Sequence, residues 1–250
     1  MYKRQPLITA PAVVKGAAIK IVAADYQKNP FDIVSPTASP IADPAALEGK
    51  TIAVSDFNIL VWKAFLKANH LTSSEVKTVP YTDGPTQLAS GQVDGYLGYT
   101  TDFSSTIGTK NEKVQEFLLA DQGLPLVSEV LLASQDTIDN HSAELEAALT
   151  AIARGWKDAV ADPAAATKLT VNTYGKGQDF TYASQLAAIT KQNSIMVTSD
   201  TKKNGLLTIS PSLIAQSIAS LKLAGITLSA SKLFDTSIIN KVYKDHPGLK

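Results

Sequence analysis

The 250-residue chain contains no cysteine and only three histidines, His70, His141 and His246. Without cysteine it can form no disulfide, no thiolate nucleophile and no Cys-ligated zinc site. The histidines are isolated from one another, and none shows the H-x-x-x-H spacing of a helical zinc site. The sequence therefore predicts no bound metal ion.

The chain also lacks an excess of charge of either sign and lacks a long apolar run. Lys+Arg and Asp+Glu number 23 each, so nothing attracts the whole chain to nucleic acid or to an anionic membrane. No apolar run approaches the roughly 20 residues that a membrane-spanning helix needs. With 44% hydrophobic and 18% charged residues, the composition is that of a folded protein with one large core or two lobes that share a hinge.

Motifs of catalysis and of cofactor binding are missing as well. Gly175–Gly177 lacks the third glycine and the preceding strand of a dinucleotide-binding turn, and there is no phosphate-binding loop. Ser229–Lys232 matches S-x-x-K, but its companion motifs K-T-G and S-D-N are absent, and no G-x-S-x-G motif occurs. We therefore expect no catalytic residue and no cofactor.

Strand and helix patterns alternate along the first half of the chain, which predicts a parallel α/β sheet. The second half is mainly helical, and Leu145, Leu149, Ile152 and Trp156 form one apolar stripe. Strands are predicted at 19–24, 31–35, 50–55, 76–81, 95–99, 114–119 and 127–133, and helices at 58–69, 85–90, 144–161, 164–173, 182–192, 211–224 and from Asp235 onward.

We divide the chain into two lobes on this basis. Residues 45–125 form a small α/β lobe, and residues 1–44 and 126–250 contribute to the other lobe. Residues 1–5 have neither the charged nor the apolar region of an export signal and resemble a translated sequencing-adaptor tail, so we expect them to be non-native. We also expect further strands of the first lobe to precede this chain. A genuine cytosolic start is the alternative.

Polar and aromatic residues follow two strands of the 45–125 lobe. Asp56, Phe57 and Asn58 come after the strand at 50–55. Tyr99 is the last residue of the strand at 95–99, and residues 100–102 follow it. Ligands of open α/β sheets bind beyond the carboxyl ends of the strands. We therefore expect ligand contacts here, although Asp56, Asn58 and Asp102 could simply cap helices, and Trp62 could belong to the core.

The other lobe offers Tyr26 and Gln27 at the end of its first strand, and Glu129 on the returning strand. Gln27 can present a donor and an acceptor to a heterocycle, whereas Glu129 could instead be a solvated residue of an edge strand. None of these loops is rich in Arg or Lys, which argues against a strongly anionic ligand. The candidate ligand contacts are Tyr26, Gln27, Asp56, Phe57, Asn58, Trp62, Tyr99, Thr100, Asp102 and Glu129.

Several segments resemble the NMT1/THI5-like substrate-binding proteins in the same order along the chain. The branch that binds thiamine pyrimidine precursors or riboflavin is the most similar, except that it usually carries Asn at the position of Asp102. The segments are Tyr26–Ser35 (YQKNPFDIVS), Leu47–Val54 (LEGKTIAV), Leu88–Tyr96 (LASGQVDGY), Gly98–Asp102 (GYTTD), Ala153–Trp156 (ARGW) and Asp162–Ala166 (DPAAA).

The resemblance implies a type II periplasmic-binding-protein fold, in which two α/β lobes close on a small organic ligand. It implies a monomer, outside the cytoplasm or tethered to the membrane by a lipid anchor, that delivers its ligand to an ABC permease and its ATPase. Sulfonates, taurine and nitrate are ligands of other family members. The rival readings are a THI5-like pyrimidine synthase, whose Cys-rich motif this chain lacks, and the effector domain of a regulator, which would need a DNA-binding helix-turn-helix.

Overall fold

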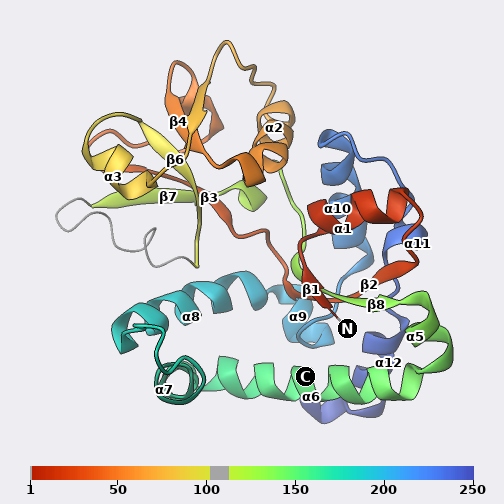
Figure 1. The fold of residues 1–250 in the computed structure, drawn as a ribbon. Helices are drawn as coiled ribbons and strands as arrows, with labels where there is room; N and C mark the ends of the chain where they lie inside the picture. Colours follow the sequence, from red (N-terminus) through yellow and green to blue (C-terminus); the bar gives the residue numbers. More distant parts are fainter. Residues whose placement is uncertain (1, 102–112) are drawn as a thin grey trace. The chain divides into compact units, whose positions relative to one another are not determined.

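The computed structural model describes residues 2–101 and 113–250, and it divides into two compact units. Unit 1 comprises Met1–Lys28, Leu126–Lys222 and Ile226–Lys250, and unit 2 comprises Asn29–Pro125 with Leu223–Gly225. The chain therefore leaves unit 1, builds unit 2 and returns. Figure 1 shows the elements of each unit.

Unit 2 is built on a five-stranded sheet with the strand order β5-β4-β6-β3-β7. Strands β5, β4 and β6 run parallel to one another, whereas β3 runs antiparallel to both β6 and β7. The sheet is therefore mixed, and the expectation of a parallel sheet was wrong for β3, which alone runs against the other four strands. The strands are β3 (Phe31–Pro36), β4 (Thr51–Val54), β5 (Lys77–Pro80), β6 (Gly95–Tyr99) and β7 (Val114–Leu118).

The placement of β3 differs from the sequence-based division, which assigned residues 1–44 to the other lobe. Residues Phe31–Ser35 are all buried, and β3 has a hydrogen-bonded neighbour on each side. The strand therefore lies inside the sheet of unit 2, with β6 and β7 as its partners. Unit 2 consequently begins at Asn29, well before the residue 45 boundary expected from the sequence.

Short helices flank this sheet, and an aromatic cluster fills its core. Trp62 stacks on Phe65, with ring centroids 5.9 Å apart, and Phe65 in turn contacts Phe117 at 6.1 Å. Val34, Ala53 and Tyr96 form part of a second cluster. The helical elements of this unit are η1 (Pro44–Leu47), η2 (Asp56–Asn58), α2 (Ile59–Ala68), α3 (Gly84–Ala89) and η3 (Leu119–Asp121).

Unit 1 contains a three-stranded sheet with the order β1-β8-β2, and both of its strand pairs are antiparallel. The strands are β1 (Tyr2–Arg4), β2 (Ile19–Tyr26) and β8 (Ser128–Ser134). In β2, residues Ile21–Tyr26 are fully covered, since helices pack against the sheet. The register between β2 and β8 shifts between Ile21 and Ala23, which marks a β-bulge.

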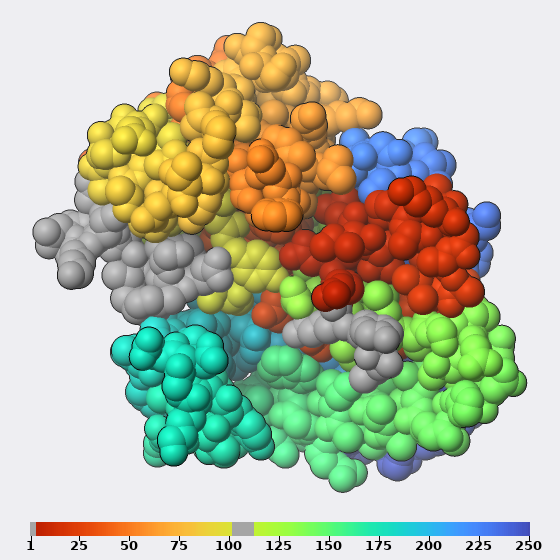
Figure 2. All heavy atoms as spheres, in the orientation of Figure 1, coloured from red at the N-terminus to blue at the C-terminus, as the bar shows by residue number. Residues whose placement is uncertain are grey.

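Helices make up most of unit 1. α6 (Ser142–Ala161) packs against α12 (Ser237–Asp245), and Leu145, Leu149 and Trp156 of the predicted stripe join this core as expected. The N-terminal helix α1 packs on β8 and α11 and lies at the surface of unit 1 (Figure 2). The remaining helical elements are α1 (Pro6–Val14), α5 (Gln135–Asn140), α7 (Pro163–Leu169), η4 (Thr170–Tyr174), α8 (Tyr182–Met196), α9 (Ser199–Asn204), α10 (Pro211–Leu223), α11 (Ala230–Leu233) and η5 (Pro247–Leu249).

Candidate ligand-binding residues

The carboxyl ends of the three parallel strands of unit 2 meet at one edge of its sheet. The chain leaves β4 into Ser55–Asn58, leaves β5 into residues 81–83, and leaves β6 into Thr100. The start of β3 lies at the same edge, because Phe31 pairs with Tyr99. The sheet order therefore brings two of the loops selected from the sequence to a common edge.

The loop after β4 exposes an aromatic ring. Phe57 is 98% exposed, the largest value among the large hydrophobic residues that the structure describes as exposed. Asp56 is also exposed, and Asn58 is half-buried at the start of α2. Neither side chain accepts a capping hydrogen bond from the helix, so the capping role considered for them is absent here. The loop thus presents one aromatic face beside a carboxylate and an amide.

The residues at the end of β6 are held more firmly. The Tyr99 ring meets the Phe31 ring edge-on, with centroids 5.4 Å apart and planes at 85°. Thr100 is buried, and its backbone N–H donates to the Pro30 carbonyl over 2.8 Å. Tyr99 is thus a half-buried aromatic whose ring is held against Phe31, and Thr100 serves the local packing. Asp102 lies outside the described residues.

Trp62 belongs to the interior of unit 2, which corrects its inclusion among the candidate ligand contacts. Its side chain has no exposed surface, and the indole N–H donates to Thr78 Oγ1 over 2.8 Å. The helix α2 turns its apolar face, with Trp62 and Phe65, toward the sheet. Both the ring and its one polar group are satisfied within the protein, so Trp62 has nothing left to offer a ligand.

Replacing Trp62 with phenylalanine is expected to lower the free energy of unfolding by about 1–3 kcal/mol. The change removes one hydrogen bond and leaves a small cavity beside Phe65. Urea unfolding measures the loss, and Thr78→Val serves as the matched variant that removes only the acceptor. A Trp62→Phe protein of unchanged stability that binds ligand more weakly would restore Trp62 to the ligand site.

In unit 1, Tyr26 and Gln27 end strand β2 beside helix α8. The Tyr26 hydroxyl donates to Gln192 Oε1 over 2.9 Å, and the Gln27 backbone N–H donates to the Ile195 carbonyl over 2.9 Å. Both residues are nearly inaccessible, with exposed fractions of 5% and 3%. The end of β2 is thereby fastened to the last turns of α8.

The Gln27 side chain has one satisfied and one unsatisfied end. Its Nε2 donates to the Ala24 carbonyl over 3.2 Å, whereas its Oε1 is buried and accepts no hydrogen bond within the described residues. Turning the amide over would bring Oε1 against the Ala24 carbonyl oxygen, so the orientation with Nε2 toward Ala24 is the favourable one. Asn193 Oδ1 on α8 is likewise buried without a hydrogen-bond partner among the residues that the structure describes.

A buried acceptor without a donor costs about 1–3 kcal/mol and calls for an explanation. Two of them occur within two residues of the contact between Gln27 and Ile195. Each of these two oxygens therefore lacks a hydrogen-bond donor among the described residues. Gln192 and Asn193 were not among the residues selected from the sequence, because nothing in the pattern of α8 distinguishes them from ordinary polar residues of a helix.

Glu129 occupies an unusual backbone conformation on β8. Its φ is 48°, in the left-handed region that residues other than glycine rarely adopt. It lies between the register pairs Ala24–Val130 and Tyr26–Ser128, next to the last residues of β2. Asp25 on that strand is buried and accepts from the Trp156 indole N–H over 3.1 Å. Glu129 is half-buried, and its backbone lies beside the Tyr26 end of β2.

Residues 2–101 and 113–250 show neither a membrane-spanning helix nor a metal-binding cluster. None of the helices there has the length and apolar character required to cross a bilayer. The same ranges contain no group of three or more His, Asp or Glu side chains placed to hold a metal ion.

The family model described as NMT1/THI5 like matches residues 3–166 of the chain, about two thirds of its length. The chain belongs to the NMT1/THI5-like family. The family model spans the Tyr26–Ser35, Leu47–Val54 and Leu88–Tyr96 segments from which the resemblance was inferred, and the prediction of the family is thereby confirmed. Among curated proteins no match is found.

Solved structures similar to this NMT1/THI5-like chain show its fold. The aliphatic sulphonate binding protein SsuA from the periplasm of Escherichia coli is 14% identical, with a TM-score of 0.67, covering 88% of this chain and 68% of that one. The ligand binding component of an ABC-type import system from Staphylococcus aureus, with zinc bound, is 13% identical, with a TM-score of 0.65, covering 96% and 79%. The desulfurization enzyme DSZB is 12% identical, with a TM-score of 0.60, covering 98% and 85%.

At these identities the likenesses establish the fold and nothing finer. The NMT1/THI5-like chain has the periplasmic-binding-protein fold, as predicted from its sequence. That fold carries both binding proteins and an enzyme among its neighbours. Function must therefore be argued from the chain's own residues.

Proposed function

We propose that this protein is the solute-binding component of an ABC importer and that its solute is a small, uncharged heterocycle rich in N–H or O–H donors. A thiamine pyrimidine precursor or a riboflavin-like molecule has this chemistry. Membership of the NMT1/THI5-like family supports the binding role. So do structural neighbours that include the ligand binding component of an ABC-type import system and a periplasmic aliphatic sulphonate binding protein.

The observation that carries the choice of solute is the pair of unsatisfied acceptors on unit 1. Gln27 Oε1 and Asn193 Oδ1 each need a donor. An aminopyrimidine and the ring system of a flavin both present N–H groups that could supply one. A sulfonate presents only acceptor oxygens at neutral pH, so burying it against these two atoms would be unfavourable. The pair therefore favours a donor-bearing solute over a sulfonate.

The exposed edge of unit 2 supplies complementary chemistry. We propose that Phe57 and Tyr99 contact the flat face of the solute, since aromatic rings stack with little loss of conformational freedom. Asp56 and Asn58 would accept from ring amino and hydroxyl groups. On unit 1 we propose Tyr26, Gln27 and Glu129 as further contacts. Trp62 is left out because its ring packs on Phe65 and its indole N–H already donates to Thr78, and Thr100 is left out because its backbone N–H is bonded to the Pro30 carbonyl.

The importer role also defines the proposed partners and location. The protein would act as a monomer on the extracytoplasmic side of the membrane and deliver its solute to a permease driven by an ATPase. We propose no nucleic acid partner, since its charges balance at 23 of each sign.

We also propose that the protein performs no catalysis, although DSZB shows that the fold can host an enzyme. A solved DSZB mutant, in which a serine replaces a cysteine, is in complex with biphenyl-2-sulfinic acid. This chain contains no cysteine at any position, so it cannot supply a thiolate nucleophile.

A thermal-shift panel tests the proposal. An aminopyrimidine precursor of thiamine or riboflavin should raise the melting temperature, because a ligand at 100 times its Kd stabilises the folded state by about 2.7 kcal/mol. For a chain of this size that amounts to roughly 5–10 °C. An alkanesulfonate, which carries no N–H donor, should leave it unchanged. A shift with the alkanesulfonate alone would overturn the choice of solute, and no shift with any of these compounds would overturn the binding role.

A further inference from the structure

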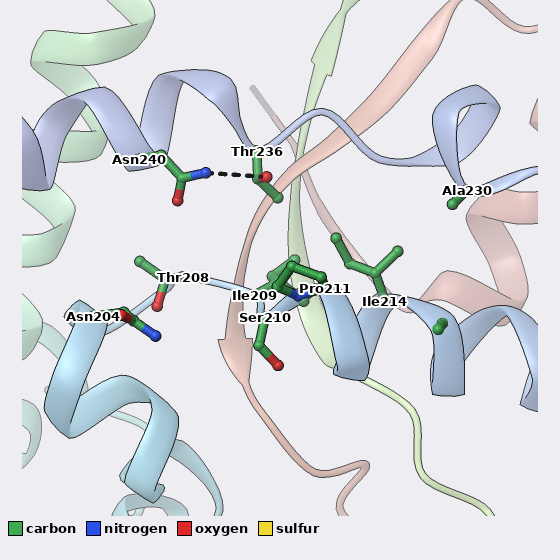
Figure 3. A pocket seen from close by; sticks show the side chains of 10 residues that line it. Asn204, Thr208, Ile209, Ser210, Pro211, Ile214, Ala230, Thr236 and Asn240 are labelled. Atoms are coloured by element: carbon green, nitrogen blue, oxygen red, sulfur yellow. Dashed lines mark hydrogen bonds between the residues drawn. The ribbon is translucent and has the colours of Figure 1, made fainter.

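A separate pocket opens in unit 1 among elements that the proposed solute contacts do not use. It is lined by the end of α9, the connection into α10, the first turn of α10, and the starts of α11 and α12 (Figure 3). Its volume is about 490 Å³, within the usual range for small-molecule sites. None of Tyr26, Gln27, Gln192 or Asn193 lines it. It is therefore a distinct cavity of the same unit.

The wall of this pocket is held in place by unusual backbone geometry. Gly205 has a φ of 105° and Leu207 a φ of 69°, so the chain makes a tight turn just before Thr208. The Leu207 carbonyl accepts from the Ala24 N–H of β2 over 3.0 Å, and the Tyr243 hydroxyl donates to the Leu206 carbonyl over 2.7 Å. The turn is thereby attached to both β2 and α12, and the pocket needs no rearrangement to exist.

The Tyr243 anchor keeps its proton at any ordinary pH. Burial raises the pKa of Tyr243 to about 12, because the charged phenolate is disfavoured away from water. The hydroxyl therefore remains a donor to the Leu206 carbonyl. The geometry of the adjacent wall should not change across the pH range in which binding would be measured.

The polar groups of the pocket are amides and hydroxyls. Asn204, Thr208 and Asn240 gather at one end, as Figure 3 shows. The Thr208 hydroxyl already donates to the Gly205 carbonyl over 2.7 Å, and the Asn240 amide donates to Thr236 Oγ1 over a long 3.4 Å. No hydrogen bond to another described residue occupies the Asn204 side chain. This end therefore offers both donors and acceptors to a ligand.

The other end of the pocket is apolar. Its apolar lining residues are Ile209, Pro211, Ile214, Ala215 and Ala230. No Lys, Arg, Asp or Glu is among its lining residues in the described part of the chain. An ion would lose its hydration there without gaining an opposite charge. The combination of an apolar lining with a carboxamide edge fits an uncharged ring that carries an amide.

We infer that this pocket is a second ligand site, which takes an uncharged, amide-bearing ring compound. Its apolar face would lie on Ile209 and Ile214. Its amide would exchange hydrogen bonds with the carboxamides of Asn204 and Asn240, which each present a donor and an acceptor. The site differs from the proposed solute site both in its residues and in tolerating ligands that have acceptors as well as donors.

Nicotinamide and nicotinate form a matched pair of probes, because they have the same ring and differ in an amide against a carboxylate. Titration of nicotinamide into the full ¹⁵N-labelled chain should shift the amide resonances of residues 204–215 and 236–240, with a millimolar or tighter Kd. Nicotinate should bind at least ten times more weakly. Equal binding of the two, no binding of either, or shifts that fall elsewhere would overturn the inference.

Two variants of α10 locate the site. Ala215 is exposed and lines the pocket, so Ala215→Phe should fill the cavity and weaken nicotinamide binding at least tenfold without disturbing the core. Ala219, one turn further along α10, does not line the pocket, so Ala219→Phe should leave the affinity unchanged. Ala215→Phe should also leave the thermal shift by the pyrimidine or flavin solute unchanged, which separates the two sites. Equal effects of the two variants on nicotinamide would contradict the assignment.

Discussion

Replacing Gln27 with leucine is expected to weaken solute binding by about 10- to 100-fold, while the unliganded protein keeps its stability to within about 1 kcal/mol. The affinity falls because the solute's donor loses the acceptor Oε1 and is left unpaired on binding. The stability holds because two effects oppose each other. The Ala24 carbonyl loses its Nε2 donor, but the protein no longer buries an unsatisfied oxygen. Calorimetric titration and urea unfolding measure the two quantities.

The matched control for this prediction is Gln178→Leu, at an exposed glutamine of the same unit that carries no proposed contact. It should change neither quantity. Asn193→Leu, which removes the second unsatisfied acceptor, should again weaken binding. If Gln27→Leu bound the solute as tightly as the wild type, Gln27 Oε1 would not be a ligand contact, and the preference for a donor-bearing solute would lose its main support.

Elements with a strong local pattern were predictable from the sequence. Residues 50–55 and 95–99 were expected to be strands, and β4 and β6 occupy Thr51–Val54 and Gly95–Tyr99. The start of α7 was predicted as well, because Pro163 suits a first helical turn and Asp162 precedes it. In the structure the Asp162 carboxylate accepts from the Ala165 N–H over 2.9 Å. Such features depend on residues that are neighbours in the sequence, so a single amino-acid sequence is enough to predict them.

The sheet that β3 joins was not predictable in the same way. Its partners β6 and β7 begin more than 60 residues later in the sequence than β3 itself. A short apolar strand can join either lobe, and the choice is made by long-range pairing rather than by local propensity. The direction of β3 was not predictable from its local sequence either. Its antiparallel pairing depends on how the connection at residues 37–50 leads the chain from β3 into β4.

The candidate ligand residues also fall into those that local sequence identifies and those that only the packing identifies. Tyr26 and Gln27 were selected from their position at a strand end, but the α8 residues beside them were not. Gln192 is 166 residues from Tyr26 in the sequence, and only the packing of α8 on β2 brings the two together. Trp62 shows the converse error, since an aromatic residue close to a loop was assigned a ligand role that its complete burial removes.

Gly205→Ala is expected to lower the free energy of unfolding by about 2–5 kcal/mol. A Cβ atom at this position would clash with the Tyr243 ring, and the φ of 105° is itself unfavourable for alanine. Strained backbone and an overpacked core each cost about 1–3 kcal/mol. The Tyr243 ring cannot simply move aside, because it is buried and its hydroxyl is bonded to the Leu206 carbonyl. Thermal unfolding should show a drop in the melting temperature on the order of 10 °C.

Gly225→Ala separates the two causes of that loss. Gly225 also has a positive φ, 81°, but a Cβ there would meet nothing within 4 Å. Its substitution should cost about 1 kcal/mol. The excess in Gly205→Ala then reports the clash with Tyr243 together with the more restrictive backbone of Gly205, whose ψ is 154°. If the two variants lost equal stability, Tyr243 would be free to yield. The turn at Gly205–Leu207, which adjoins the second pocket, would then be deformable. The second pocket could not be treated as preformed.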